Sequence, residues 1–414
     1  MCKLKIRLVL VMFLYSATSS AAEWLIEPAL GLKTQYDDNI YLRAANEVDA
    51  SAVIVDPSIT FEGKEEIWNL RFDSRLRSIK YSGVDDADSN NLFLKFSAGR
   101  SMERSQLGIS ANFDRNTTFD REFDTQLPEA GLIESKIERE TLTIGPYWSW
   151  RTSDKIQMSL NLNVTDVTYS ENAPLNYNDN SVGTIKFSIS RRQSEQVSLG
   201  VILKNTQTDI EERDYESEQN ALQVFYNYSF SENASIDLLA GASTIDYVFH
   251  NYRDCVGGVW IQTFSGPFCT GSEVVRDQAD DKSINEFNIS YKYESELGDF
   301  NMSMYRSINT SSSGSATQSD YLTVKYNRKL TPRLKASLLF SGSKIETLDG
   351  LNASQDNEQY RFQPAINWKF SEYWNLGFNY RYIKQIITDT DVESDSNAVY
   401  VNLSMRWPRL ASTY

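Results

Sequence analysis

The amino-acid sequence predicts an all-β fold, a closed antiparallel up-and-down barrel of about 18 strands. Three observations lead to this prediction. Apolar and polar residues alternate along almost the whole chain after residue 22, the alternating stretches are long enough to be strands, and the connections between them are alternately short and long.

The alternation has the period of two that is typical of strands with two different faces. Near the C-terminus, for example, Val399, Val401 and Leu403 fall on one face, and Tyr400 and Asn402 fall on the other. No long stretch shows the 3.6-residue period of an amphipathic helix. The predicted strands are 24–36, 51–62, 66–81, 90–101, 104–115, 139–151, 155–170, 180–192, 196–210, 217–230, 233–249, 283–295, 299–309, 318–330, 333–346, 356–370, 374–388 and 394–407.

The connections indicate where this barrel resides. Short turns such as 63–65, 153–154 and 371–372 follow the even-numbered strands, whereas long acidic loops such as 116–138 and 250–282 follow the odd-numbered ones. Most strands reach the about 9–11 residues that a tilted strand needs to cross a bilayer. Short turns on one side and long loops on the other are typical of barrels in the Gram-negative outer membrane, with both termini periplasmic. We therefore predict a transmembrane barrel with short periplasmic turns and long extracellular loops.

Residues 1–22 are predicted to be a signal peptide, and residues 23–414 the barrel itself. Lys3, Lys5 and Arg7 precede a short apolar run, and small residues at Ser20 and Ala22 fit a cleavage site. The signal peptide predicts export.

Charge and composition exclude several functions. The chain has 41 basic and 56 acidic residues and a formal net charge of −15, which argues against a nucleic-acid partner. A single histidine, His250, leaves little room for histidine-based metal sites or catalytic triads. We predict no catalytic residues, no cofactor and no metal site.

The polar face, which is expected to line the lumen, is rich in basic residues. One reading is a pore that favours anionic solutes or an acidic polymer, with Arg71, Arg75 and Arg77 forming a positive ladder interrupted only by Asp73. The other is that these cations pair with acids across strands and merely fill the lumen. The predicted pore-lining basic residues are Arg71, Arg75, Arg77, Lys95, Lys186, Arg192, Lys204, Lys325, Lys335, Arg361, Lys369, Arg381 and Arg406.

Aromatic residues fall on both faces. Those on the lumen face are candidates for stacking against sugar rings, or for packing on other lumen side chains: Phe93, Tyr147, Phe225, Tyr305 and Tyr400. On the lipid face, tryptophans near the short turns are expected to form a periplasmic aromatic girdle: Trp68, Trp148, Trp150, Trp368, Trp374 and Trp407.

Cys255 and Cys269 are the two cysteines that remain once a signal peptide containing Cys2 is removed, and both lie in loop 250–282. The periplasm is oxidising, so we predict a disulfide between them. The loop either folds inward as a constriction or stands outside as a cap.

Residues 26–32 (IEPALGL), 36–41 (YDDNIY) and 55–61 (VDPSITF) resemble the start of outer-membrane β-barrel porins of the barrel porin 2 type. The resemblance implies a barrel associated with exopolysaccharide or capsule export, working with a periplasmic polysaccharide-export protein. Export of polysaccharide is therefore the first function predicted. The alternatives are a general or anion-preferring diffusion porin for small anionic solutes, and a structural or adhesive surface barrel. The surrounding partners are outer-membrane lipid and lipopolysaccharide, which divalent cations are expected to bridge to the acidic loops.

Overall fold

The computed structural model describes residues 23–117, 136–170, 178–210, 214–256, 260–263, 266–310, 316–348, 356–388 and 390–413. The predicted signal peptide lies outside these residues. The strands are β1 (Glu23–Asp37), β2 (Ala50–Lys64), β3 (Trp68–Ser82), β4 (Ser89–Ser101), β5 (Ser105–Thr117), β6 (Glu138–Arg151), β7 (Ile156–Tyr169), β8 (Asn180–Arg192), β9 (Val197–Ile210), β10 (Tyr215–Ser231), β11 (Ala234–Val256), β12 (Trp260–Thr263), β13 (Gly266–Cys269), β14 (Ser272–Ser295), β15 (Gly298–Thr310), β16 (Ala316–Lys329), β17 (Leu334–Thr347), β18 (Asn357–Trp368), β19 (Trp374–Ile387), β20 (Val392–Arg406) and β21 (Leu410–Thr413).

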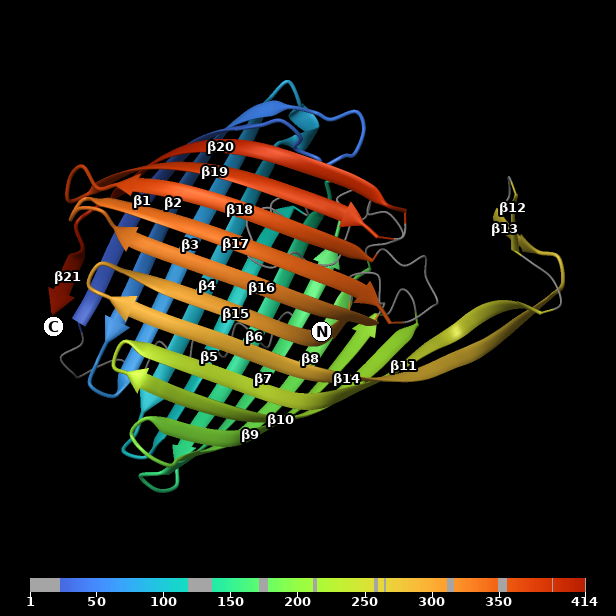
Figure 1. Ribbon diagram of the computed structural model, residues 1–414, viewed down its shortest axis with the longest axis horizontal. Coiled ribbons are helices and arrows are strands. Elements are labelled where there is room, and N and C mark those ends of the chain that lie inside the picture. Colours follow the sequence, from blue (N-terminus) through green and yellow to red (C-terminus); the bar gives the residue numbers. More distant parts are fainter. Residues whose placement is uncertain are drawn as a thin grey trace.

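The strands form a closed antiparallel barrel (Figure 1). Within the described residues, one sheet contains nineteen strands, of which eighteen are long and the other is the short β21. Each long strand pairs with its neighbours in chain order, and β1 pairs with both β2 and β20, which closes the circle. The predicted barrel is confirmed, and most predicted strand ends lie within two residues of the observed ones.

Contacts that skip a strand identify the inner face of the sheet. Arg381 on β19 donates to Asp37 on β1 across β20, and Gln219 on β10 donates to Glu286 on β14 across β11. Side chains on a concave face converge and those on a convex face diverge, so these residues point inward. The cross-strand pairs carry this assignment around the barrel, because directly opposed residues share a face.

The outer face is apolar. Residues such as Val53, Leu76, Val164, Leu203 and Val224 are exposed there, each by at least half of its surface. A closed ladder with an apolar exterior suits a bilayer, because every strand then hydrogen-bonds to two neighbours and presents hydrocarbon to lipid. The six tryptophans predicted to form a girdle lie on or beside strand ends at the short turns. No helix in the described part of the chain is long and apolar enough to cross a membrane.

The short turns share a hydroxyl motif that explains their recurrence. Ser153 Oγ accepts from the backbone nitrogens of residues 155 and 156, at 3.4 and 3.1 Å. The same two bonds recur at Ser194, Thr331 and Ser371. A serine or threonine hydroxyl can replace a backbone acceptor in a tight turn. The turn residues therefore reverse the chain without a long loop.

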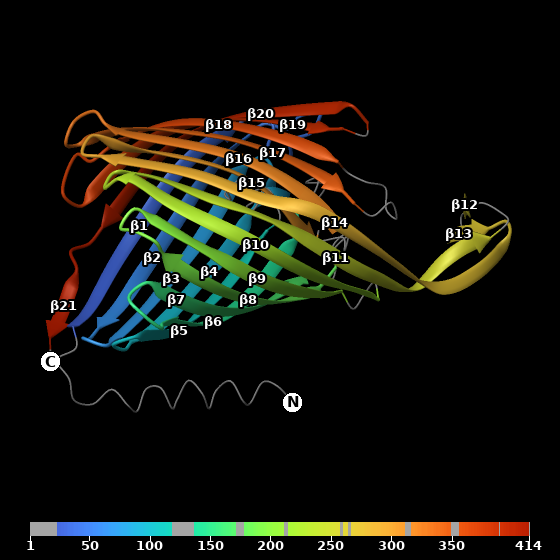
Figure 2. The ribbon, with the colours of Figure 1, turned by 60° about the horizontal axis from the view of Figure 1, so that its bottom comes forward.

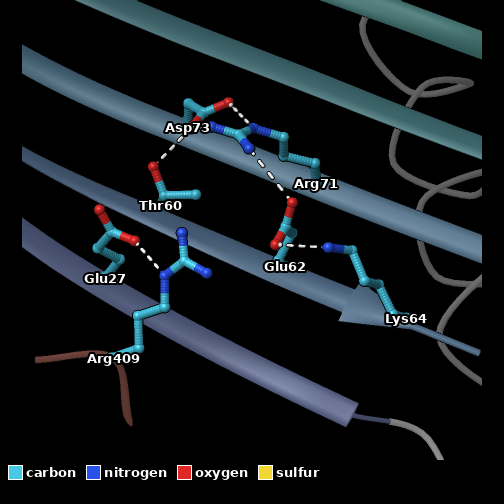
Figure 3. A network of polar contacts seen from close by, with 7 residues as sticks. All are labelled: Glu27, Thr60, Glu62, Lys64, Arg71, Asp73 and Arg409. Atoms are coloured by element: carbon cyan, nitrogen blue, oxygen red, sulfur yellow. Dashed lines mark hydrogen bonds and ion pairs between the residues drawn. The ribbon is translucent and has the colours of Figure 1, made fainter. Parts of the chain in front are cut away.

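At the seam of the barrel, β1 pairs with two different strands along its length, which the sequence did not predict. Residues 29–37 of β1 pair with β20, whereas residues 23–26 pair with β21. Between these two stretches of β1, Trp407 donates its backbone N–H to the carbonyl of Pro28 at 3.0 Å. Beside this bond, Arg409 Nε lies 2.7 Å from Glu27 Oε2 (Figure 3). The C-terminal segment thus extends the closure toward the end of the barrel that carries the short turns.

The predicted loop 250–282 is largely a two-stranded extension of β11 and β14. Their pairing continues to Val256↔Ser272, beyond the last pair of β10 with β11 at Tyr215↔Phe249. The extension stands away from the barrel and carries the β12–β13 hairpin at its tip (Figures 1 and 2). The backbone of the described part of this segment therefore projects outward, as in the predicted cap. It does not fold into the lumen as a constriction.

Candidate functional site: the inner wall

The inner wall is the candidate site because it carries the predicted basic and aromatic residues. The strand pairings place the predicted basic residues that lie within strands on the inner face, and Lys369 just beyond the end of β18. They do not form one continuous ladder. In the part of the chain that the structure describes, some of these cations contact carboxylates, and others, such as Lys186 and Lys204, do not.

The wall formed by β2 and β3 has charge pairs (Figure 3). Arg71 lies between two carboxylates, with Nε 2.7 Å from Asp73 and Nη1 3.2 Å from Glu62. Asp73 also accepts from the Thr60 hydroxyl at 2.6 Å, and Glu62 lies 3.2 Å from Lys64. The guanidinium and its two carboxylates therefore form a hydrogen-bonded network rather than a free positive charge.

Farther from the turn that joins β2 and β3, one carboxylate lies close to two arginines. Asp56 lies 3.4 Å from Arg75 Nε and 3.3 Å from Arg77 Nε. Phe93, on β4, lies under both cations, with its ring centre 4.3 Å from the Arg75 guanidinium carbon and 5.7 Å from that of Arg77. The predicted positive ladder is therefore largely neutralised, because β2 supplies inward acids opposite β3.

A buried charge pair closes the barrel at the end opposite the short turns. Arg381 and Asp37 are 5% and 2% exposed, and their side chains are 2.8 Å apart. Asp37 also accepts from the Ser396 hydroxyl at 2.7 Å and from the backbone N–H of Asn39 at 3.0 Å. Its neighbour Asp38 binds the backbone and side-chain nitrogens of Asn397 at 2.7 and 2.9 Å. The YDDN segment of the porin resemblance thus ties β1 to β19 and β20.

The wall formed by β8 and β9 is different. Lys186 and Lys204 are directly opposed in the strand pairing and both face inward. Among the described residues, no carboxylate lies within 4.0 Å of either ammonium group. The nearest acid in this region is Glu286, which is 4% exposed and accepts from the side-chain amides of Gln219 and Gln223. Sequence reasoning missed Glu286 and its two glutamines, although their inward parity was readable.

A second opposed lysine pair lies at the rim that carries the short turns. Lys329 and Lys335 face each other at the ends of β16 and β17, next to the turn that joins these strands. Both are exposed, and in the described part of the chain neither has a carboxylate within 4.0 Å. Lys335 was predicted from its parity, whereas Lys329 was missed although it lies within the predicted strand 318–330 and has the parity of Lys325.

The inward aromatic residues are distributed around the barrel and pack against the wall. Tyr147 lies over Gly108, where an added Cβ would come within 2.3 Å of the ring, and Phe225 lies over Gly200 in the same way. Tyr305 packs against Tyr321 with ring centres 4.8 Å apart. Each of these rings contacts residues of the barrel wall beside it, as the Phe93 ring contacts Arg75 and Arg77. Stacking against sugar rings stays a prediction.

Tyr400 belongs to the closing strands. Its ring lies 4.0 Å from the Lys33 ammonium and 5.1 Å from the Arg381 guanidinium carbon.

The cysteines lie in the hairpin extension, Cys255 on β11 and Cys269 on β13. Their side chains lie outside what the structure describes, so the disulfide stays a prediction. At the base of the same extension, His250 Nδ1 lies 3.3 Å from Asp277, and both side chains are exposed.

Comparisons with known proteins bear on the fold. No protein-family model and no curated protein matches the chain. Solved structures match over most of its length. The ferric-catecholate import receptor Fiu of E. coli K12 is 8% identical, with 94% of this chain and 82% of that one covered and a TM-score of 0.50. OccK1 of Pseudomonas aeruginosa is 12% identical, with 93% and 99% covered and a TM-score of 0.46.

This chain has the fold of an outer-membrane β-barrel. At such low identity the likeness concerns the fold alone, and it agrees with the apolar exterior and closed ladder described above. The barrel part of the predicted porin resemblance is confirmed.

Proposed function

We propose that this barrel is an outer-membrane diffusion channel that favours small anionic solutes. A barrel of sixteen to eighteen strands is wide enough to leave an aqueous channel. The observation that carries the preference for anions is the opposed pair Lys186 and Lys204, which lies midway along β8 and β9 without a carboxylate in contact among the described residues. Fixed cations in a low-dielectric wall raise the local concentration of anions.

Liposome swelling with three solutes of one size tests this proposal. Glucose, glucuronate and glucosamine share a hexose frame and carry charges of zero, minus one and plus one near neutral pH. We expect all three to enter vesicles that contain the barrel, in the order glucuronate, glucose, glucosamine. An empty vesicle provides the control. Entry of glucosamine ahead of glucuronate would contradict the preference, and entry of none would contradict diffusion.

Export of polysaccharide, the first function predicted from the sequence, rests on the resemblance of residues 26–61. In that segment, Asp37 and Asp38 have a structural role at the barrel seam. An exporter that opens only with its periplasmic partner would admit none of the three hexoses alone, so the swelling assay separates this function from free diffusion.

A surface or adhesive role has one observation in its favour, the hairpin extension that stands beyond the barrel (Figure 2). The extension can be removed between Phe249 and Gln278, which are paired. Deleting it should leave swelling unchanged if the barrel wall carries the function.

A further inference from the structure

We infer that Lys186 and Lys204 form an oxyanion-binding site on the inner wall, which takes a phosphate or carboxylate group of a passing solute. This inference rests on the proposed function, because it names the solute chemistry that the channel would favour. The evidence is the placement of the two lysines, the engagement of the nearest acid, and the hydroxyl groups beside the pair.

The two lysines stand where like charges repel. Lys186 is the central residue of β8, and its pairing partner Lys204 lies in the middle of β9. Directly opposed residues on antiparallel strands have Cα atoms about 4.5–5.5 Å apart, and like charges in that position are destabilising. A bound anion between the ammonium groups would remove this repulsion.

The nearest acid is already engaged by other donors. Glu286 Oε1 accepts from Gln219 Nε2 at 3.2 Å, and its other oxygen accepts from Gln223. Gln219 also donates to the Ser243 hydroxyl, at 2.8 Å. This carboxylate is buried against β10 and β11 and does not contact Lys204, so two ammonium groups face one acid that is held by amides. The local charge is positive.

Hydroxyl groups lie on both sides of the lysine pair along the strands. Two positions toward the extracellular end, Thr184 and Thr206 are in hydrogen-bond contact at 3.2 Å. Two positions toward the periplasmic end, Ser188 meets Ser159 at 2.6 Å. In each hydroxyl pair one group donates to the other, which leaves one O–H hydrogen available for a ligand oxygen. An oxyanion has several acceptor oxygens, whereas chloride has no directional acceptors, so this arrangement favours phosphate or carboxylate.

The rim pair Lys329 and Lys335 provides a matched control. It also consists of two lysines that are directly opposed and face inward, but their side chains are exposed beside the short turn that joins β16 and β17. Replacing either pair by glutamine removes two positive charges from the same face of the sheet. A difference between the two double variants therefore reports the site rather than the total charge.

Phosphorus-31 line broadening of inorganic phosphate, measured with the folded barrel in detergent, tests the site without requiring conduction. We expect the wild type to broaden the signal, K186Q/K204Q to bind phosphate about tenfold more weakly, and K186R/K204R to retain binding, because charge-assisted hydrogen bonds are lost only in the first variant. K329Q/K335Q should behave as wild type. Migration on an unheated gel shows that each variant is folded.

No broadening by wild type, or equal loss in both glutamine variants, would overturn the site. Phosphate binding by a barrel that fails to swell vesicles would leave the site intact and overturn the diffusion function instead.

Discussion

The β2–β3 wall and the β8–β9 wall carry inward cations in the same alternating pattern, yet only the first has carboxylates in contact with them among the described residues. Arg71, Arg75 and Arg77 share Glu62, Asp73 and Asp56, whereas Lys186 and Lys204 oppose each other. The alternation of a strand determines which face a charge occupies. The neighbouring strand determines whether that charge is neutralised.

The chemistry of the two cations fits this difference. A guanidinium is planar and offers several donors, so it can hold two carboxylates at once, as Arg71 does. A lysine ammonium is a compact point charge on a flexible stem, which suits contact with a mobile anion. The arginine wall is therefore suited to structure and the lysine wall to solutes.

The largest expected effect comes from breaking the buried arginine–carboxylate pair at the seam, Asp37 with Arg381, which is less exposed than the pairs of the β2–β3 wall. Asp37→Ala should lower the free energy of unfolding by about 3–5 kcal/mol, because it leaves the Arg381 guanidinium buried without its carboxylate. Urea unfolding of the barrel in lipid vesicles, followed by tryptophan fluorescence, measures this change. Asp281→Asn, on the outward face of β14, is the control and should have little effect. Equal stability of Asp37→Ala and wild type would show that the pair contributes nothing.

A smaller effect is expected when a pair inside the pore is broken. Asp56→Asn removes the carboxylate shared by Arg75 and Arg77, so the arginine wall should begin to act as the lysine wall does. One charge about 10 Å from the ion path, at an effective dielectric constant of about 20 and a Debye length of about 10 Å, changes the local anion concentration by about two- to threefold. Because the cation concentration changes by the same factor in the opposite sense, the anion-to-cation permeability ratio should change by about four- to ninefold. The reversal potential in a salt gradient across a planar bilayer reports this ratio.

In that measurement Asp281→Asn again serves as the control, because it removes one negative charge outside the lumen. A reversal potential that moves equally in both variants would mean that the wall charges of β2 and β3 do not face the ion path.

The smallest change concerns ionic strength. Raising potassium chloride from 0.1 to 1 M shortens the Debye length from about 10 to about 3 Å. We expect the anion preference of the wild type to fall toward unity, since the field of Lys186 and Lys204 no longer reaches across the lumen. A preference that is the same at both salt concentrations would argue against selection by this field.

Much of the barrel was predictable because the membrane imposes a period on the sequence. Strand β8 was predicted at its observed bounds, and β9 began one residue from the predicted position. The inward parity of the basic residues followed from the same period. The extension of β11 and β14 was missed because a two-stranded ribbon beyond the membrane has no lipid face, so residues 272–282 are acidic without alternation. The short β21, after Pro408, has too few residues to show any period.

The pairing of charges was not predictable from the sequence. Asp37 and Arg381 are 344 residues apart, and their contact exists only because β1 pairs with β20 and so comes close to β19. The same holds for Glu286, whose partners come from a strand two positions away in the sheet. Alternation predicts a face for each residue, and three-dimensional closure selects its neighbours.

The Asp37–Arg381 contact also gives the barrel a way to recognise its own correct closure. A slip of one residue between β1 and β20 would turn a whole strand inside out, and a slip of two would preserve the faces but move Asp37 by about 6–7 Å along the strand. In either case the buried arginine and Asn397 would lose their carboxylate partners. Since β1 is the first and β20 the last of the eighteen long strands in the chain, this contact is available only when the other long strands are in place. A misaligned seam would therefore be less stable than the aligned one, because it would leave the Arg381 guanidinium buried without a carboxylate partner.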